Sequence, residues 1–335
     1  MDVLSKTVGE VFSQKSVVIV GDIVADQFLH GTISRVSREA PVFILKHDST
    51  QTRPGAGANA AVNVASLGGK PLLIGCVGDD ANGDRLLEAL RDLGVNTQHI
   101  NRRSEVSTTT KIRVLAGQHY AARQQVIRID YEDSSAFSAG LKSTLRHYLA
   151  SVADVADAII ISDYNYGAVF PEIYEDALAI SRDRAIPLIV DSRFSLNNFH
   201  DATSATPNSD EVEHILGKNF GPDDCSLLRQ RLGYKALLVT NGNQGMTLFE
   251  NGQPPLKIGV VGPTEPVDVT GAGDTVIAAY ALGLASGLSF TDAATIANHA
   301  GGIVVMKKGT SSAAASEVLE SIESSESNAV SANTN

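Results

Sequence analysis

The sequence has few cysteines and no long apolar run. Its two cysteines, Cys76 and Cys225, stand apart without metal-ligand spacing, which argues against a disulfide framework or a zinc site and favours a reducing compartment. No stretch of about 18 apolar residues, the length that crosses a bilayer, is present, and the N-terminus carries no signal-peptide pattern. We therefore expect a cytoplasmic protein with no membrane partner.

Positive charge is also scarce. The 335 residues contain 27 lysines and arginines against 38 aspartates and glutamates, a formal net charge of -11, and no basic run interrupts this pattern. A nucleic-acid partner is therefore not expected, and any anionic substrate must be held by local basic groups. With 43% hydrophobic residues, the chain can bury a sizeable core in one large α/β domain or two smaller ones.

The most informative stretch is Asp268–Asp274, which has the sequence DVTGAGD and continues into an apolar segment. Small residues at the start of a predicted helix leave backbone N–H groups without intrahelical partners, and these groups form a cradle for an anion. Gly271 and Gly273 would let a phosphate approach the backbone closely. A carboxylate beside a phosphate site is repelled by the phosphate, so an acid at this position needs a functional reason. We interpret Asp274 as a general base that accepts the proton of a substrate hydroxyl. The alternative is an ordinary acidic residue in a first helical turn.

Two further segments indicate a ligand site. Ser16–Gly21 is typical of a buried strand, and Asp22 and Asp26 follow it, either as sugar-hydroxyl ligands or as turn residues. Arg53–Ala60 contains a formal G-x-G-x-x-A match to the dinucleotide fingerprint, but no strand directly precedes it and the required acidic residue is missing. We therefore expect a sugar to lie against the start of the next helix, and a nicotinamide oxidoreductase is the weaker alternative.

From residue 158 onward, strands and helices alternate, which predicts a doubly wound α/β fold with a mostly parallel central sheet and helices on both faces. Ligands of such sheets bind at the carboxyl ends of the strands. The predicted strand ends carry the polar residues Asp22, Asp163, Asp191, Asn208 and Thr240. We expect one domain over residues 1–315 and a disordered tail over residues 316–335, because the Ser, Glu and Asn-rich end has little apolar content.

Residues 27–53 and 107–131 alternate in polarity outside this rhythm, which predicts a small β-sheet lid. An isolated small sheet exposes edges and an apolar face, so we expect two lids to pair in a homodimer. The scarce positive charge gathers in the lid, where it could bind a distal phosphate of the substrate. The basic residues expected to do so are Arg35, Lys111, Arg113 and Arg128.

Taken together, residues from about Val17 to Thr310 resemble the ribokinase (PfkB) family of sugar kinases. Asp268–Asp274 is similar to the family's C-terminal signature, and Pro54–Asn63 is similar to its N-terminal one. The resemblance implies a ribokinase-like fold and a transfer of phosphate from ATP, with Mg²⁺, to a sugar or sugar phosphate. A non-catalytic sugar or nucleotide sensor is the alternative of another class, although a sensor has no need of a base such as Asp274.

The resemblance also implies roles for individual positions. The resemblance implies that Asp274 is the base and that the anion hole consists of the backbone amides of Gly271, Ala272, Gly273 and Asp274. We expect the sugar near Asp22, Asp26, Gly55, Ala56, Gly57, Asn59 and Asp163. Asn208 and Glu211 would organise Mg²⁺ and phosphate, Thr240, Gly245 and Asn298 would line the nucleotide pocket, and Asp268 and Thr270 stand where the family often binds a potassium ion.

Within the family, five segments are most similar to kinases of D-glycero-β-D-manno-heptose 7-phosphate, which serve lipopolysaccharide core synthesis. These segments are Ser34–Pro41, Arg53–Gly55, Thr110–Arg113, Ile127–Asp130 and Ser162–Tyr164. The resemblance implies phosphorylation of the anomeric hydroxyl to the 1,7-bisphosphate, and a kinase for another sugar or sugar phosphate is the alternative of the same class. The chain departs from this group at Asp191–Phe194, which replaces Asp-Pro-Lys-Gly, and at Tyr166, where lysine is usual.

Overall fold

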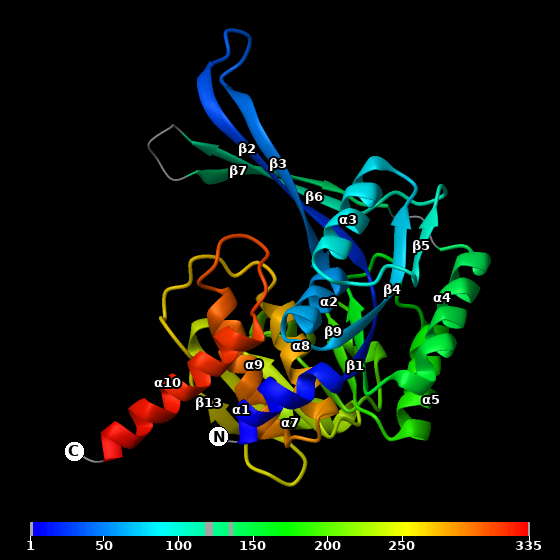
Figure 1. Ribbon diagram of the computed structural model, residues 1–335, viewed down its shortest axis with the longest axis vertical. Helices are drawn as coiled ribbons and strands as arrows, with labels where there is room; N and C mark the ends of the chain where they lie inside the picture. Colours follow the sequence, from blue (N-terminus) through cyan, green and yellow to red (C-terminus); the bar gives the residue numbers. More distant parts are fainter. Residues whose placement is uncertain (1–2, 118–122, 134–136, 334–335) are drawn as a thin grey trace.

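The computed structural model describes residues 3–117, 123–133 and 137–333, and it contains a nine-stranded central sheet and a smaller four-stranded sheet (Figure 1). The central sheet has the order β13-β12-β11-β10-β9-β8-β1-β4-β5, in which the strands from β11 to β5 are parallel and β12 and β13 are antiparallel. Its strands are β1 (Ser16–Gly21), β4 (Lys70–Gly78), β5 (Ile100–Arg103), β8 (Ala158–Asp163), β9 (Leu188–Ser192), β10 (Ser204–Ala205), β11 (Ala236–Thr240), β12 (Met246–Glu250) and β13 (Leu256–Ile258). The predicted fold class is confirmed.

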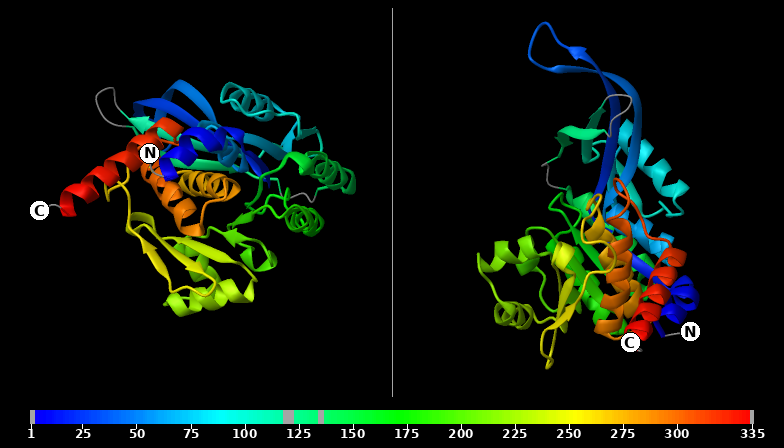
Figure 2. Two further views of the ribbon diagram at one scale, coloured as in Figure 1. Left: turned by 60° about the horizontal axis from the view of Figure 1, so that its bottom comes forward. Right: turned by 90° about the vertical axis from the view of Figure 1, so that its left-hand side faces the viewer.

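The central strands are buried on both faces because helices cover both sides of the sheet (Figure 2). In β1, Val17 and Ile19 pack into one core, whereas Val18 and Val20 pack into the other, as the two-residue period of a strand requires. The first core packs against α2 (Gly57–Ser66), α3 (Ala81–Asp92), α8 (Ala272–Ala285) and α9 (Phe290–Val304). The second packs against α4 (Ala139–Val152), α5 (Pro171–Arg184), α6 (Ser209–Leu216) and α7 (Pro222–Arg231). Short helical segments are α1 (Val3–Lys6), η1 (Thr7–Val11), η2 (Phe12–Gln14), η3 (Ala153–Val155), η4 (Leu196–Asn198) and η5 (Gly242–Gln244).

The smaller sheet is the predicted lid, and it projects from the central domain (Figure 2, right). Its strands have the order β3-β2-β6-β7. They are β2 (Ile23–Val36), β3 (Phe43–Ala56), β6 (Thr110–Gly117) and β7 (Gln124–Tyr131). Because β2 begins only two residues after β1 ends, the lid rises from the carboxyl edge of the central sheet, where α/β proteins bind their ligands.

The end of the chain differs from the prediction. The expected disordered tail forms the helix α10 (Ala315–Asn333), in which Val318 and Ile322 are buried in the core beside α9. These two residues are four positions apart and therefore lie on one face of a helix. The low average hydrophobicity of the tail concealed this narrow apolar stripe. No helix in the described part of the chain is long and apolar enough to span a membrane.

Candidate active site

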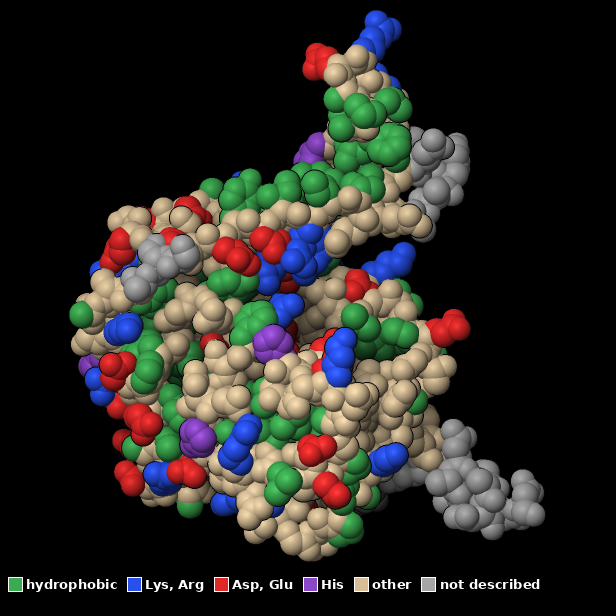
Figure 3. All heavy atoms as spheres, turned by 180° about the vertical axis from the view of Figure 1, so that it is seen from behind, with side chains coloured by type: hydrophobic (Ala, Val, Ile, Leu, Met, Phe, Trp, Pro, Cys, Tyr) green, Lys and Arg blue, Asp and Glu red, His purple; other side chains and the backbone are tan. Residues whose placement is uncertain are grey.

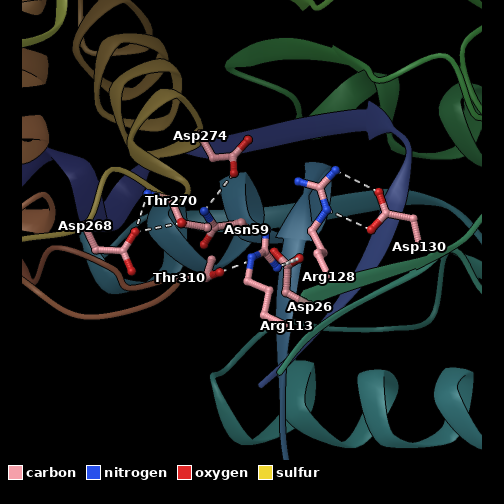
Figure 4. Close-up of polar contacts among 9 residues, drawn as sticks. All are labelled: Asp26, Asn59, Arg113, Arg128, Asp130, Asp268, Thr270, Asp274 and Thr310. Atoms are coloured by element: carbon pink, nitrogen blue, oxygen red, sulfur yellow. Dashed lines mark hydrogen bonds and ion pairs between the residues drawn. The ribbon is translucent and has the colours of Figure 1, made fainter. Parts of the chain in front are cut away.

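Asp274 is a buried acid in the first turn of α8. Only 4% of the Asp274 surface is exposed. Asn59 Nδ2 donates a hydrogen bond to Asp274 Oδ2 at 2.8 Å (Figure 4), and the Tyr164 hydroxyl donates one to Oδ1 at 3.0 Å. Burial raises the pKa of Asp274 to about 7, although the hydrogen bonds from Asn59 and Tyr164 oppose this rise. A carboxyl group with a pKa near neutrality can both accept and release a proton at physiological pH, as a general base must.

The turn before α8 forms an open cradle of backbone amides. Gly271 has a φ of 79°, and a Cβ there would lie 2.5 Å from Asn59 Nδ2, so a larger residue would displace the side chain that holds Asp274. The Ala272 amide is already bonded to a carbonyl of the turn at 3.2 Å, whereas the helix start leaves the amides of Gly273 and Asp274 for a ligand. A Cβ on Gly273 would meet no atom within 4 Å, so the space beside these amides is open.

Asn59 and Tyr164 have roles that differ from the predictions. The sequence predicts a sugar contact at Asn59, but its Nδ2 bonds both Asp274 and the Gly271 carbonyl, the latter at 3.3 Å. Asn59 therefore positions the Asp274 carboxylate in the structure, and its contact with a sugar stays a prediction. Tyr164 is not among the predicted site residues, although its place directly after a buried strand was an available signal. Burial, followed by the charge of Asp274, holds the pKa of Tyr164 well above its usual value, so its hydroxyl stays protonated and donates.

Asp22 is bound by the loop that follows β8. Its carboxylate is buried and accepts hydrogen bonds from the backbone amides of Tyr164, Tyr166 and Ala168, at 2.8, 3.0 and 3.0 Å. Burial raises the pKa of Asp22 to about 6 against the effect of these three bonds. Both carboxylate oxygens are therefore engaged by the loop after β8, and Asp22 positions Tyr164 where the sequence predicts a sugar contact.

Asp163 connects two neighbouring strands of the central sheet. Its Oδ2 accepts a hydrogen bond from Ser192 Oγ at 2.7 Å, and its Oδ1 accepts one from the Asn165 amide at 3.1 Å. The residue is buried at the carboxyl ends of β8 and β9. Asp163 therefore has a structural role in the sheet, and its contact with a sugar stays a prediction.

The glycine-rich turn brings α2 close to the sheet. A Cβ on Gly55 would lie 2.6 Å from Asp26 Oδ2, so glycine is needed for the carboxylate to approach the turn. Ala56 has a φ of 55°, which is uncommon for a residue other than glycine and occurs where surrounding contacts enforce it. The Gly57 amide donates to the Asp22 carbonyl at 3.0 Å. These contacts fix the start of α2 against Asp26, as the predicted sugar site requires.

Asp26 joins the lid to the central domain. It accepts hydrogen bonds from Arg113 of the lid and from Thr310 Oγ1, the latter at 3.3 Å (Figure 4). Lys111 is also buried in this region, with its Nζ 5.4 Å from the centre of the Tyr166 ring. Burial lowers the pKa of Lys111, and the charge of Asp26 opposes this change. The structure therefore brings three predicted site residues together at the root of the lid.

Arg128 and Arg35, the other two predicted phosphate ligands of the lid, do not join the cluster around Asp26. Arg128 forms a two-point ion pair with Asp130, with distances of 2.8 and 2.9 Å. Arg35 lies next to the end of β2 and is exposed on the arm that projects from the domain, so the structure does not bring it to Asp274.

A pocket beside the amide cradle contains the predicted nucleotide residues. Its walls include Thr240, Gly245 and Asn298 together with Ala272 and Gly273 of the cradle. Asn298 is buried and its Nδ2 donates to the Gly259 carbonyl at 2.6 Å, while a Cβ on Gly245 would lie 2.1 Å from a backbone oxygen. The pocket therefore connects the N-terminus of α8 to a site large and apolar enough for a purine base.

Asn208 and Glu211 cap the start of α6. The Asn208 side chain accepts from the Glu211 amide, and the Glu211 carboxylate accepts from the Asn208 amide, both at 2.9 Å. Burial raises the pKa of Glu211, and burial together with the charges of Glu211 and Asp274 raises the pKa of Asp191 well above its usual value. In the described residues, no group of three or more His, Cys, Asp or Glu side chains is arranged to hold a metal by itself.

Asp268 orders the loop that precedes the cradle. Its Oδ1 accepts from the Thr270 amide and hydroxyl at 3.0 and 2.7 Å, and its Oδ2 accepts from the Gly309 amide at 2.9 Å (Figure 4). Desolvation raises the pKa of Asp268, but these hydrogen bonds outweigh it and hold the pKa below its usual value. Asp268 is therefore ionised and ties the cradle loop to the loop after α9.

An acid that can remove a proton beside an amide cradle suits phosphoryl transfer from a nucleotide to a hydroxyl group, so the fold and the site define a kinase. Comparison with known families matches residues 14–317 to the pfkB family carbohydrate kinases. The chain belongs to this family and is an ATP-dependent sugar kinase.

Individual relatives agree with this assignment. The chain is 37% identical over 321 residues to bifunctional protein HldE of Nitrosococcus oceani and 38% identical over 318 residues to that of Shewanella amazonensis. Each match covers 93% of this chain and 64% of the relative, so the chain spans less than two thirds of these proteins. Among solved structures, ribokinase of Arabidopsis thaliana complexed with ribose and ATP has a TM-score of 0.68 at 22% identity, covering 92% of this chain and 98% of that one. Phosphofructokinase-2 of Escherichia coli in complex with substrates and products has a TM-score of 0.72 at 19% identity, covering 91% and 97%.

Proposed function

We propose that the protein phosphorylates the anomeric hydroxyl of D-glycero-β-D-manno-heptose 7-phosphate, forming the 1,7-bisphosphate and ADP. The observation that carries the reaction type is the buried Asp274 at the open amide cradle of α8. The sugar is supported by the five segments similar to heptose 7-phosphate kinases and by the similarity to the HldE proteins. Because the chain differs from the heptose 7-phosphate kinases at Tyr166 and Asp191–Phe194, a kinase for another sugar phosphate is the second candidate.

In the proposed reaction, Asp274 accepts the proton of the anomeric hydroxyl while that oxygen forms its bond to the γ-phosphorus of ATP and the bond to ADP breaks. Asn59 and Tyr164 hold the carboxylate toward the acceptor by their hydrogen bonds. The amides of Gly273 and Asp274 would bind the phosphoryl oxygens as charge builds up on them. Catalysis is thus mainly positioning and electrostatic stabilisation.

Mg²⁺ is proposed to bind near Glu211 and Asp191. Burial raises the pKa of both carboxyl groups, and the charge of Glu211 raises that of Asp191 further, so a cation between them would stabilise their ionised forms. Mg²⁺ usually keeps several waters and binds one or two carboxylates plus substrate phosphates, which fits a pair of acids without a full ligand set. When bound, it would neutralise charge on the phosphates. A potassium ion at Asp268 and Thr270 stays a prediction, and so does the cytoplasmic location.

A homodimer through the lid is also proposed. In β7 the side chains of Ile127, Ile129 and Tyr131 lie on the face opposite Arg128 and Asp130, as strand alternation requires, and all three are exposed. Hydrophobic side chains follow the lid in Figure 3. An apolar sheet face of this kind favours coverage by a second copy of the chain.

An ATP-consumption screen tests the proposed function. Heptose, hexose and pentose sugars and their phosphates would be compared at equal concentrations, and phosphorus NMR would locate the new phosphate. We expect the highest kcat/KM for the heptose 7-phosphate with a new anomeric phosphate. A higher kcat/KM for a different sugar phosphate, or phosphorylation at another hydroxyl, would replace the proposed substrate.

A further inference from the structure

The inner face of the lid carries the charged residues that face the central domain. Strand register aligns them in two cross-strand rows, and side chains of paired residues lie on the same face. The row at the root is Arg53, Asp26, Lys111 and Asp130, and the next row is Gln51, Phe28, Arg113 and Arg128. Lys and Arg side chains also surround the hollow between lid and domain in Figure 3. Two cavities open on this face.

The two cavities differ in charge. The first, which we name the arginine cavity, has a volume of about 570 Å³ and is lined by the basic residues Arg53, Arg113, Arg123 and Lys308 and by the acid Asp268. The second, the edge cavity, has a volume of about 410 Å³ and is lined by the basic residues Lys111, Arg128 and Arg193 and by the acids Asp130, Glu132 and Asp133. Basic and acidic side chains therefore balance in the edge cavity, whereas basic side chains are in excess in the arginine cavity.

Contacts of the basic groups sharpen this difference. In the edge cavity, Arg128 is held at two points by Asp130. In the arginine cavity, Arg113 is paired with Asp26 and Arg123 with Asp48. Arg53, however, donates to the neutral Thr310 carbonyl at 2.7 Å, so its charge is not cancelled there. Burial lowers the pKa of His30 on the cavity wall, and the charges of Arg123 and Arg53 act in the same direction, whereas Asp48 opposes them.

The arginine cavity is adjacent to the proposed acceptor site. Its Arg113 is paired with Asp26, and Thr310 bonds both Asp26 and Arg53. Its opposite wall contains Asp268 and Thr270, which belong to the loop that carries Asp274. In Figure 4, Arg113 and Asp26 lie beside Thr310, between the Asp268 loop and the Arg128 pair.

We propose that the arginine cavity binds the distal phosphate of a phosphorylated acceptor sugar. This inference rests on the proposed function and assigns to the phosphate three residues that are not among the four expected to bind it: Arg53, Arg123 and Lys308. A phosphate dianion is stabilised by charge-assisted hydrogen bonds from arginine and lysine, and it is repelled by carboxylates. The edge cavity, with as many acids as bases, offers a phosphate no net attraction.

Steady-state kinetics with two acceptors test the proposal. Lys308→Ala should raise KM about tenfold for heptose 7-phosphate and much less for unphosphorylated heptose, because one charge-assisted contact is lost. Arg123→Ala should have the same selectivity but a smaller effect, because Asp48 already holds part of the charge of Arg123. Arg128→Ala should raise KM for the phosphorylated sugar less than about threefold, since its charge is already paired. Arg146→Ala is the matched control, because Arg146 is also paired with a carboxylate, Asp176, at 2.5 Å, but lies on α4 away from the lid. Equal changes for the two sugars, or a larger effect of Arg128→Ala, would overturn the proposal.

A variant with the opposite expected sign separates phosphate binding from damage to the lid. Asp48 pairs with Arg123 at 2.6 Å and competes with a phosphate for it. Asp48→Asn should therefore lower KM for heptose 7-phosphate by about two- to threefold, the range of a weak exposed ion pair. A purely structural role of the pair predicts that Asp48→Asn and Arg123→Ala both raise KM.

Binding of inorganic phosphate distinguishes failure of this inference from failure of the proposed function. Calorimetric titration of phosphate with saturating ADP should show weaker binding in Lys308→Ala by at least about fivefold, whether or not heptose is turned over. If heptose 7-phosphate is not a substrate but Lys308→Ala binds phosphate more weakly than wild type, the proposed function is wrong and the cavity assignment is supported. If phosphate binding is unchanged, the cavity assignment is wrong.

Discussion

Charged side chains at the start of α8 and in the lid have different kinds of hydrogen-bond partner. At α8 the carboxylate of Asp274 is buried and bonded by the neutral groups of Asn59 and Tyr164. In the lid, charged groups are paired with each other, as in Arg128 with Asp130. A buried carboxyl group with neutral partners keeps a raised pKa and can exchange a proton, whereas an ion pair keeps both charges fixed. The first region is therefore suited to chemistry, whereas in the second only basic groups without a carboxylate partner, such as Arg53, can attract a charged ligand.

The largest expected effect comes from Asp274→Asn, which keeps the size of the side chain but removes its ability to accept a proton. If Asp274 is the general base, kcat should fall by roughly 10² to 10⁴ while the Kd for ATP is unchanged or lower, because a repelling charge is lost. An ordinary helix-terminal Asp would instead leave turnover nearly unchanged. Retention of more than about a tenth of wild-type turnover would contradict the assignment.

The same variant has a pH-dependent effect on stability. The pKa of Asp274 is raised from 3.8 to about 7, so the neutral form stabilises the fold at low pH and this contribution is lost as pH rises through 7. Asn does not ionise. The melting temperature of Asp274→Asn relative to wild type should therefore be higher at pH 8 than at pH 5. A difference that is the same at both pH values would mean that the carboxyl group is already ionised in the folded protein at pH 5, so that its pKa is not raised.

The next effect concerns the lid alone. Ile127→Glu places a charge on its exposed apolar face and should weaken the proposed dimer by at least about tenfold, because like charges would meet or be desolvated at the interface. Sedimentation velocity over a concentration series measures this change. Leu227→Glu is the matched control, since Leu227 is also an exposed apolar residue but lies on α7. A wild-type protein that is monomeric at micromolar concentration would refute the dimer.

The two regions also differ in how far the sequence predicts them. The βαβ rhythm and the alternating lid segments predict both sheets, because periodicity reports which face of an element is buried. The local motif at Asp274 predicts the amide cradle, since the cradle is formed by residues that are adjacent in the sequence. The partners of Asp22, Asp163 and Asn59 come from distant segments, so a sequence motif cannot show that their polar atoms are already engaged.

Tyr164→Phe gives the smallest effect and tests whether neutral partners tune the base. The hydroxyl of Tyr164 lowers the pKa of Asp274 against burial, so its loss should raise that pKa by roughly one unit, as expected for one hydrogen bond to a charged group. The base acts in its ionised form, so activity is lost as pH falls through its pKa. Turnover should therefore fall roughly fivefold at pH 7 and change little at pH 9.

The pH profile of kcat/KM distinguishes tuning from simple positioning. Tyr174→Phe is the matched control, because the Tyr174 hydroxyl is also bonded, to the His200 carbonyl at 2.6 Å, but lies on α5 away from the cradle. Its profile should match that of wild type. If Tyr164→Phe lowers kcat/KM equally at every pH, the hydroxyl only holds the carboxylate in place. If the acidic limb moves to higher pH, the neutral donors around Asp274 set the pH at which the base works.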